Sequence, residues 1–562
     1  MSPTLRRLLC TLSLSLPVSA CSGDKADSSA EDDGGDDGGD DGGDDGGGDD
    51  GGDEGGDDGG DEGGDDSSTG TDADADGHTV EDGDCDDADP TVNPGATDEM
   101  WVDRDCRAGV ERSAATTFIA GDGSHNNLGW ATAVVPDQNG DGVDDIFSSS
   151  RSGASLNLLV WSGTEVAAGT RTGVADAFGR FDLAYNTTSF PHMAVGGDVM
   201  GTGGPMVFVA AAAPGDTHET AWLIDLSAIS AGETIVTADL PSVSAADLPG
   251  GTYMGSGHST DLDLDGDGVM DLVLGLPSFD VESTGGEGRI DVHLGASMRT
   301  SPQRMSADAD ITVLSDVYGR LGQEIHPAGD VDGDGIVDLV TGTRYRPDPD
   351  TGAEYAGAAY IFSGAALAAG EVDTTADALI TLLAPTVDGA GTQMGARGGP
   401  VADLTGDGRP EFVVAGDGVG ALHGALFIFD AQELEAGTLR ADAAWHTVWG
   451  GTDTDQIGYR YDLGGYDADA DGQAELVVGG HANGASHYLM STAAMSDGGQ
   501  TTLGGDGAMA TWLMHDVVGT AAAEVVTGDI DGDGDNELLL SAAHDLVAGV
   551  PSGAIYLVPD RP

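Results

Sequence analysis

The chain has 562 residues, in which 100 acidic side chains stand against only 20 Lys and Arg, for a formal net charge of -80. Phosphate binding requires a positive surface, so this balance excludes nucleic acid as a partner, whereas divalent cations suit so many carboxylates. Aromatic residues make up only 5% and there are 93 glycines, so a fold of long buried helices is not expected.

Residues 1–21 have the features of an export signal, with two arginines followed by a mostly apolar run. The segment Val-Ser-Ala-Cys at 18–21 resembles the lipobox of bacterial lipoproteins, which implies that Cys21 carries a lipid after cleavage. The alternative is an ordinary signal peptide cut near Ala20. We therefore expect a protein of the cell envelope that is attached to the outer membrane through its lipid anchor only.

A polyacidic linker follows, over residues 22–71. Its centre, residues 31–66, consists only of Asp, Glu and Gly, with 19 acidic residues and 17 glycines. Such a segment has no apolar surface to bury and repels itself, which predicts a disordered tether. A loose calcium-buffering tract is the alternative.

Residues 72–108 form a compact Asp-rich module around Cys85 and Cys106. Its alternating carboxylates place several oxygens on one side of a turn, as hard cations require. The candidate ligands are Asp72, Asp74, Asp76, Asp84, Asp86 and Asp89. The two cysteines are expected to form one disulfide in an oxidising compartment. The module resembles the MopE-like metal-binding motif of bacterial surface proteins, although one cysteine of that motif is missing. The alternative is an acidic linker with a single disulfide.

A nine-residue pattern, Asp-x-Asp/Asn-x-Asp-Gly-x-x-Asp/Glu, recurs through the remaining chain. Copies begin at Asp137, Asp263, Asp330, Asp403, Asp467 and Asp529, the fourth with Thr405 at its third position. From Asp263 onward the starts lie 67, 73, 64 and 62 residues apart, and the first gap of 126 residues spans two periods. A degenerate copy at Asp198 falls inside that gap. The repeat therefore predicts seven units, six of them with loops that can bind a cation.

Short apolar runs follow the loops, as at 272–274, 339–340, 412–414 and 476–478, and a second run comes farther along, as at 358–362 and 425–429. β-Branched and aromatic residues bounded by Gly and Pro predict strands. Before most loops stands an apolar residue followed by Gly. These pairs are Leu128–Gly129, Met254–Gly255, Leu321–Gly322, Met394–Gly395 and Ile457–Gly458.

Together, these loops, strands and pairs resemble the FG-GAP repeats of integrin α-chains, over about residues 121–562. The resemblance implies an all-β fold, a seven-bladed β-propeller over residues 114–562, because four-stranded units that close into a ring leave only short edges. Residues 114–120 precede the first unit and have no blade of their own. We therefore expect them to pair with the strand at 554–558 and to close the ring.

Each loop offers side-chain oxygens at positions 1, 3, 5 and 9 and a backbone carbonyl at position 7, and Gly at position 6 allows the bend. Calcium takes about six to eight oxygens, which these loop positions can supply in large part. Because six loops are intact, we expect about six calcium sites, and the family resemblance implies that the same loop positions provide the ligands. The candidate ligands are Asp137, Asn139, Asp141, Val143, Asp145, Asp263, Asp265, Asp267, Val269, Asp271, Asp330, Asp332, Asp334, Ile336, Asp338, Asp403, Thr405, Asp407, Arg409, Glu411, Asp467, Asp469, Asp471, Gln473, Glu475, Asp529, Asp531, Asp533, Asp535 and Glu537. The degenerate unit has Met200, Thr202 and Met206 at positions 3, 5 and 9, so we expect no ion there. The alternative for every loop is an empty Asp-Gly turn.

Three functions remain open. A lipid anchor, a long tether and a rigid propeller suit a binding or adhesion module whose ligand is a protein or a glycan. The second is a calcium-dependent carbohydrate-active protein, either a lectin or a polysaccharide-degrading enzyme. The third is a scaffold without a small ligand. No His-Glu-x-x-His and no nucleophile elbow stands out, and His258, His326 and His481 are expected to be packed or surface residues. We therefore expect no enzyme.

Overall fold

A computed structural model describes residues 73–79, 88–94, 96, 110–111, 117–122, 127–169, 173–186, 191–216, 218–248, 254–255, 257–280, 286–385, 391–401, 403–407, 409–418, 424–450, 457, 463–467, 474–480, 485–492, 495, 498–503, 508–514, 525–534, 536–543, 546–547 and 550–558. The chain divides into two units, Met1–Ser67 and Ser68–Pro562, and all described residues belong to the second. The export signal with Cys21, the acidic linker, Cys85 and Cys106 lie outside the described residues.

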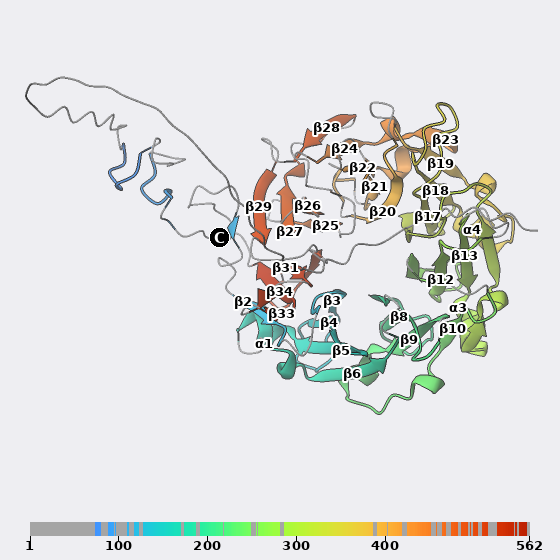
Figure 1. Cartoon of the computed structure of the whole chain (residues 1–562), viewed down its shortest axis with the longest axis horizontal. Helices are drawn as coiled ribbons and strands as arrows, with labels where there is room; N and C mark the ends of the chain where they lie inside the picture. Colours follow the sequence, from blue (N-terminus) through green and yellow to red (C-terminus); the bar gives the residue numbers. More distant parts are fainter. Residues whose placement is uncertain are drawn as a thin grey trace, which may run out of the picture. The chain divides into compact units, whose positions relative to one another are not determined.

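Within the described residues, seven sheets have four or five strands each, and the four main strands of each sheet run antiparallel to their neighbours (Figure 1). The first sheet contains β3 (Thr132–Val135), β4 (Asp145–Ser152), β5 (Ser155–Ser162) and β6 (Gly179–Ala184). The second contains β7 (His192–Gly196), β8 (Met206–Ala212), β9 (Glu219–Asp225) and β10 (Ser242–Ser244). The third contains β11 (His258–Leu262), β12 (Asp271–Leu276), β13 (Arg289–His293) and β15 (Ile311–Leu314).

The remaining four sheets repeat this plan. The fourth contains β16 (Ile325–Gly329), β17 (Asp338–Thr343), β18 (Ala358–Phe362) and β19 (Ile380–Leu383). The fifth contains β20 (Met394–Pro400), β21 (Phe412–Gly416), β22 (Ala425–Phe429) and β24 (His446–Trp449). The sixth contains β25 (Leu463–Tyr466), β26 (Glu475–Gly480), β27 (Ala485–Met490) and β29 (Ala508–Met514). The seventh contains β30 (Val525–Gly528), β31 (Glu537–Ala542), β34 (Ala554–Val558) and, from far earlier in the chain, β2 (Thr117–Ala120).

These sheets lie around a common axis (Figure 1). The first strand of each sheet contacts the first strand of the next, from β3 through β7, β11, β16, β20 and β25 to β30, and β30 contacts β3. Large apolar side chains pack between neighbouring sheets, as Phe412 and Phe427 of the fifth sheet do against Ile361 and Leu382 of the fourth. The all-β propeller predicted from the sequence is therefore confirmed.

The apolar–Gly pairs anchor each sheet to the one before it. The apolar members Leu128, Met254, Leu321, Met394 and Ile457 are completely buried. Leu321 and Met394 form parallel bridges to Gly288 and Gly357 of the preceding sheets. Gly395 has φ +87°, and a Cβ there would lie 2.5 Å from the carbonyl oxygen of Ala358. Only glycine fits this turn, which explains why the pair recurs.

Short extra strands join neighbouring sheets at their outer edges, each running parallel to the edge strand. β14 (Gln303–Met305) pairs with β10, β23 (Gly437–Arg440) with β19, β28 (Gly499–Thr502) with β24, and β1 (Val110–Glu111) with β29. In each case the extra strand comes from the segment just before the outer strand of the following sheet. They cover edges that would otherwise expose unpaired backbone groups.

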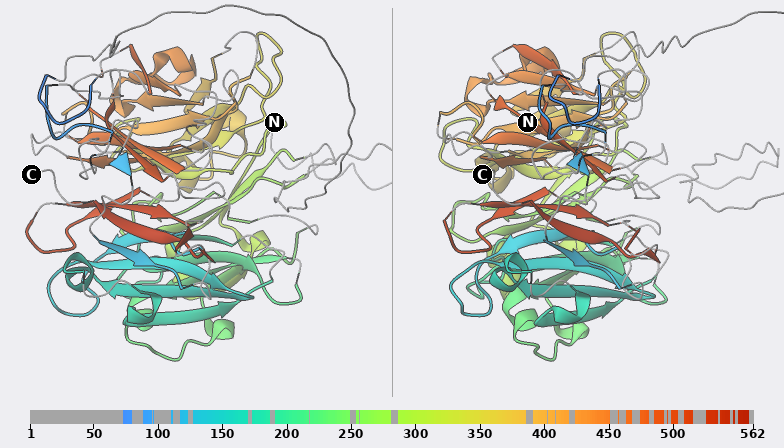
Figure 2. Two further views of the ribbon diagram at one scale, coloured as in Figure 1. Left: turned by 60° about the vertical axis from the view of Figure 1, so that its left-hand side comes forward. Right: turned by 90° about the vertical axis from the view of Figure 1, so that its left-hand side faces the viewer.

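The N-terminal strand β2 completes the seventh sheet, as the sequence predicted. Its residues pair antiparallel with β34, from Thr117 with Leu557 to Ala120 with Ala554. The predicted segment began at residue 114, and the strand itself begins at Thr117. Ile119 is 1% exposed and belongs to one core cluster with residues of β4, β5 and β34. Figure 2 shows the seventh sheet, in red, directly beside the first sheet, in cyan.

Helical structure is confined to single turns between strands. The α-helices are α1 (Gly163–Ala167), α2 (Leu226–Ser230), α3 (Gly295–Thr300) and α4 (Gly364–Ala368), each directly after the third strand of a sheet. The 3-10 turns are η4 (Val174–Asp176), η5 (Thr237–Asp239), η6 (Ser306–Asp308), η7 (Thr375–Asp377), η9 (Ala431–Glu433) and η10 (Ala441–Ala443), and β32 (Leu546–Val547) and β33 (Val550–Pro551) form a small hairpin. Among the described residues, no helix has the length and apolar character needed to cross a membrane.

Candidate metal-binding loops

The six predicted loops each connect the first strand of a sheet to its second strand. In four of them, the first residue, an Asp, accepts a hydrogen bond from the backbone N–H of the Gly at position 6. The distances are 2.8 Å from Gly142 to Asp137, 2.9 Å from Gly268 to Asp263, 3.0 Å from Gly335 to Asp330 and 3.1 Å from Gly534 to Asp529. These four glycines have φ between +84° and +100°. The bend therefore requires glycine, and it turns the first carboxylate toward the centre of the loop.

The ninth residue of each loop is an acid at the start of the second strand, and it is buried. Asp145, Asp271 and Asp338 are at most 1% exposed. Each accepts the backbone N–H of loop position 2, for example 2.9 Å from Leu264 to Asp271. Burial raises the pKa of all three carboxyl groups to about 6. Burial disfavours the ionised form of a carboxyl group, and a cation beside the group stabilises that form.

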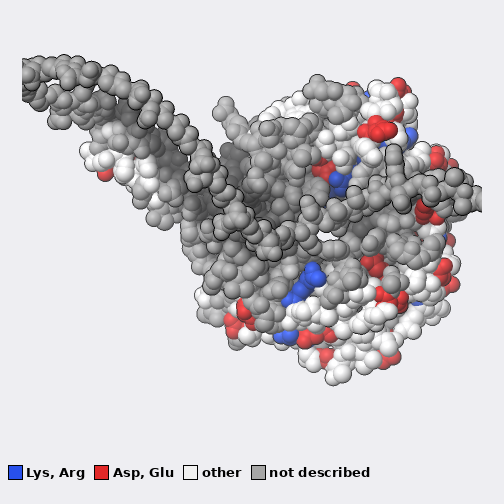
Figure 3. All heavy atoms as spheres, viewed as in Figure 1, with Lys and Arg blue, Asp and Glu red and all other residues white. Residues whose placement is uncertain are grey.

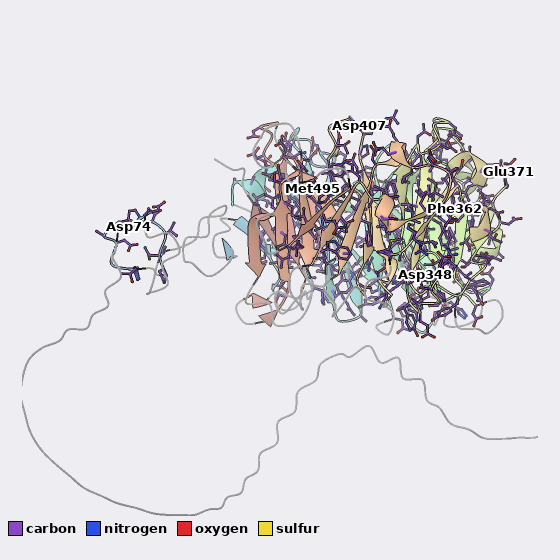
Figure 4. All side chains as sticks on the ribbon, turned by 90° about the horizontal axis from the view of Figure 1, so that it is seen from above. Asp74, Asp348, Phe362, Glu371, Asp407 and Met495 are labelled. Carbon is purple, nitrogen blue, oxygen red and sulfur yellow. The ribbon has the colours of Figure 1, made fainter. Side chains whose placement is uncertain are left out.

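Four loops bring three carboxylates together, with ligand oxygens within 4.8 Å of one another. The groups are Asp263, Asp265 and Asp271; Asp330, Asp332 and Asp338; Asp403, Asp407 and Glu411; and Asp529, Asp531 and Glu537. Figure 4 labels Asp407 at one edge of the ring of sheets. Three oxygen ligands converging on one point form the core of a site for a hard cation, and backbone carbonyls and water can complete it.

The acid at position 5 does not join these groups in three of the four loops. Asp267 and Asp334 each accept the backbone N–H of position 7 at 2.8 Å, from Val269 and Ile336. Asp533 is likewise outside the group of its loop. In these three loops the acids at positions 1, 3 and 9 lie together, while position 5, which the sequence analysis also gave as a ligand, serves the turn as a local acceptor. In the fourth loop, Asp407 does both, because it also accepts from Arg409 at 2.9 Å.

Two loops lack an acid at position 3, and there the polar side chain bonds to the buried ninth residue. Asn139 Nδ2 donates to Asp145 Oδ1 at 2.8 Å, and Thr405 Oγ1 donates to Glu411 Oε1 at 2.8 Å. In the first loop, Asp141 accepts the N–H of Val143 at 3.0 Å. The first loop thus keeps the turn of the others but has an amide at position 3, where the second, third, fifth and sixth loops have a carboxylate.

Several candidate ligands lie outside the described residues. They are Asp469, Asp471, Gln473 and Asp535 of the last two intact loops, and Asp72, Asp84 and Asp86 of the Asp-rich module. Asp467 and Glu475, at the two ends of the fifth loop, are described, and Glu475 is 2% exposed. In the module, Asp74, Asp76 and Asp89 accept backbone N–H groups two residues ahead. These bonds form local turns, and the described residues of the module do not bring three acids together.

The degenerate loop contains a positive side chain that the sequence analysis missed. Asp198 keeps the turn, with Gly203 N–H donating to its carboxylate at 2.7 Å. Arg299, from α3 of the next sheet, donates to the backbone oxygens of Val199 and Asp198 at 3.0 and 3.1 Å. Burial alone would raise the pKa of the Asp198 carboxyl, but its backbone hydrogen bonds and, to a smaller extent, the charge of Arg299 hold this pKa below its usual value. Met206 is buried in the core. A guanidinium from the next sheet therefore lies beside the one loop that has methionines in place of acids at positions 3 and 9.

No protein-family model matches the chain. The chain is 32% identical over 167 residues to integrin alpha-5 of Xenopus laevis, a match that covers 28% of this chain and 14% of the integrin's length. Among solved structures, the Dos1 propeller matches with a TM-score of 0.35 and 8% identity, covering 78% of this chain and 79% of that one. A rhamnogalacturonan lyase of Bacillus licheniformis matches with a TM-score of 0.30 and 15% identity, covering 76% and 66%. The integrin match supports the similarity to integrin-type repeats.

Proposed function

We propose that this protein is a calcium-stabilised β-propeller of seven blades that is held at the cell envelope and presents a surface for a protein or glycan ligand. The observation that carries the proposal is the repeated cluster of three carboxylates, one of them buried, at the same place in four sheets. The closed cycle of contacts between first strands supports the seven-bladed ring.

Calcium is the cation that these loops suit best. All side-chain donors are oxygens, and no Cys or His takes part in the carboxylate groups, which argues against a soft metal. With free calcium tenfold above the dissociation constant, one site adds about 1.4 kcal/mol to the free energy of unfolding. Six independent sites would add roughly 8 kcal/mol, which is comparable to the stability of a whole domain.

The proposal extends to segments outside the described residues. Lipidation of Cys21 would anchor the chain in the outer membrane, and the acidic linker of residues 22–71 would act as a disordered tether. A disulfide between Cys85 and Cys106 would stabilise the Asp-rich module. We propose a binding, adhesion or scaffold role without catalysis. A carbohydrate-active role, as a lectin or a polysaccharide-degrading enzyme, is the second candidate.

Thermal unfolding with calcium or with excess chelator tests the role of the metal. We expect calcium to raise the melting temperature strongly and isothermal titration to count about six propeller sites. The variant Asp265→Ala should lose one site and about 1.4 kcal/mol of the calcium effect, because it removes one ligand side chain from a cluster of three. Asp239→Ala, at an exposed acid outside every loop, is the matched control and should keep all sites. A melting temperature that is the same in calcium and in chelator would exclude a structural role for calcium.

A further inference from the structure

Aromatic and basic side chains gather at the end of the ring opposite the metal loops. Strand β17 begins at the last residue of a metal loop and ends at Thr343, and Arg344 and Tyr345 follow it directly. Figure 4 shows Asp348, a few residues farther along, on the opposite side of the ring from the loop residue Asp407. The six residues of β17 separate the two ends by about 20 Å, since a strand rises about 3.3 Å per residue.

Five residues from two neighbouring connections form what we call the Tyr–Arg surface: Tyr318, Arg320, Arg344, Tyr345 and Tyr355. Tyr345 lies at its centre. The guanidinium carbons of Arg320 and Arg344 lie 5.0 and 5.3 Å from the centroid of its ring, and the ring centroids of Tyr318 and Tyr355 lie 6.4 and 5.5 Å away. The backbone N–H of Tyr345 donates to the carbonyl of Gly319 at 3.3 Å, which ties the two connections together. The surface is therefore ordered before any ligand arrives.

The outer tyrosines of this surface are open to solvent. Tyr318 is 37% exposed and Tyr355 48%, whereas the other exposed large hydrophobic residues of the described chain, Phe178 and Val236, lie on the first and second sheets. No exposed Leu, Ile, Met or Phe adjoins the tyrosines among the described residues. Tyr and Arg are also enriched in protein-binding hot spots, so an acidic peptide or protein is the competing ligand. The lack of a wider apolar area around these tyrosines favours a smaller, more polar ligand with flat apolar faces.

The two arginines of the surface differ in their partners. Arg344 forms an ion pair with Asp417 at 2.5 Å, as Arg289 and Arg440 do with aspartates elsewhere. Within the described residues, Arg320 forms no ion pair and lies over the Tyr345 ring instead. Acidic side chains dominate the charged atoms on the face that Figure 3 displays. A guanidinium without a carboxylate, beside exposed tyrosines, is available to an anionic group of a ligand.

We propose that the Tyr–Arg surface binds an acidic oligosaccharide, with a uronate carboxylate on Arg320 and sugar rings against Tyr318 and Tyr355. A planar guanidinium matches the two oxygens of a carboxylate, and the C–H faces of a sugar pack on aromatic rings. This inference deepens the proposed function and rests on it, because it assigns a ligand class to the binding role.

The large negative charge of the chain opposes such a ligand both locally and at a distance, because exposed Asp316 and Glu354 stand close to Tyr318 and Tyr355 in the chain. At an ionic strength of about 0.15 M the Debye length is about 8 Å, so carboxylates at the metal-loop end, about 20 Å away, are largely screened. The guanidinium of Arg320 acts at contact distance, where screening is weak. We therefore expect binding at physiological ionic strength and a weakening of affinity in low salt, which is the opposite of the usual behaviour of a basic site.

Isothermal titration of the full chain with tetragalacturonate, at a fixed free calcium concentration, tests the proposal. Cellotetraose provides a neutral sugar and hexa-aspartate a polyanion without sugar rings. We expect binding of tetragalacturonate alone, weakened about tenfold by Arg320→Gln and about tenfold by Tyr318→Ala with Tyr355→Ala. Phe178→Ala, which is equally exposed on another sheet, and Arg180→Gln, an exposed arginine paired with Asp182, should leave the affinity unchanged.

Each other result overturns the assignment. Equal affinity for cellotetraose would remove the role of Arg320, and equal affinity for hexa-aspartate would indicate an acidic peptide or protein partner. Binding that survives both surface variants would place the ligand elsewhere. No binding by the wild-type chain, while calcium still raises its melting temperature, would reject this surface as a glycan site and leave the calcium-stabilised propeller intact.

Discussion

The buried acid at the ninth loop position determines how the metal-free and calcium-bound proteins differ. Asp145, Asp271 and Asp338 have pKa values of about 6, raised chiefly by burial, against 3.8 for an unperturbed Asp. Without a cation, the folded state therefore retains protons that the unfolded state has already released. The contribution of these three acids to the stability of the metal-free protein is therefore greatest where they are protonated and falls as the pH rises from about 4 to about 6.

This sign gives a prediction about pH. A bound cation keeps the three carboxylates ionised in the folded state, so the difference in melting temperature between calcium and chelator should be small near pH 4. It should grow through about pH 6 and be constant above it. His192 and His258, with pKa values of about 4 and about 3 because of burial, favour unfolding in acid with or without calcium, so they cancel in this difference. A difference that does not change with pH would show that these acids do not contact the metal.

At the scale of single residues, the repeated pattern identifies the candidate ligands within each loop. It cannot identify contacts between residues that are far apart in the sequence. Positions 1, 3 and 9 cluster as predicted because their spacing is local to one turn. The hydrogen bond that takes Asp267 away from the cluster depends on the precise path of the turn. Arg299 reaches the degenerate loop from about 100 residues farther along, so no local pattern could indicate it.

The degenerate loop has an arginine where the other loops have a third or fourth acid. Arg299 donates to two backbone oxygens of this loop, and a Cβ on Gly201 would lie only 2.8 Å from the guanidinium carbon. Restoring acids at Met200 and Met206 would therefore place carboxylates in a partly apolar site that a guanidinium already adjoins. The guanidinium of Arg299, a side chain of the protein itself, thus stabilises the conformation of this loop.

We expect Arg299→Met to lower the free energy of unfolding by about 1–3 kcal/mol, because two backbone acceptors lose their donor and the Asp198 carboxylate loses a nearby positive charge. Calcium should not restore the loss, since positions 3 and 9 of this loop offer no oxygen. Arg180→Met, at an exposed ion pair, should change stability by less than about 0.5 kcal/mol. Chemical denaturation with and without calcium measures both variants. Recovery of the Arg299 variant in calcium would indicate that the loop can take an ion after all.

Among the elements, long strands were predictable and the shortest were not. The runs at 358–362 and 425–429 are strands as predicted, because they are apolar throughout and buried on both faces. β1 has two residues and no apolar pattern of its own. Its position is explained by the repeated arrangement of the sheets, since β14, β23 and β28 each pair in parallel with the outer strand of another sheet. That equivalence becomes visible only when the sheets are assembled.

At the scale of the whole molecule, β1 and β2 connect the last sheets to the first. Deleting residues 109–120 should lower the melting temperature and cause aggregation even in saturating calcium, because it exposes the edge of β34. Ile119→Ala should cost about 2–5 kcal/mol by leaving a cavity in the cluster with Ile555 and Leu557. Deleting the linker of residues 22–71 is the control and should leave the melting temperature unchanged. If the 109–120 deletion melts at the wild-type temperature, these strands do not hold the ring together.

The pairing of β2 with β34 also sets the time at which folding can finish. Thr117 and Leu557 are direct partners although 440 residues separate them in the chain. At a synthesis rate of about 5–20 residues per second, β2 waits roughly 20–90 s for its partner to be made. Throughout that interval, the growing chain has an unpaired strand at its start and an open sheet at its advancing end, which are the features that favour misassembly. An arrested chain that stops short of β34 keeps both edges exposed, however many complete sheets precede the stop.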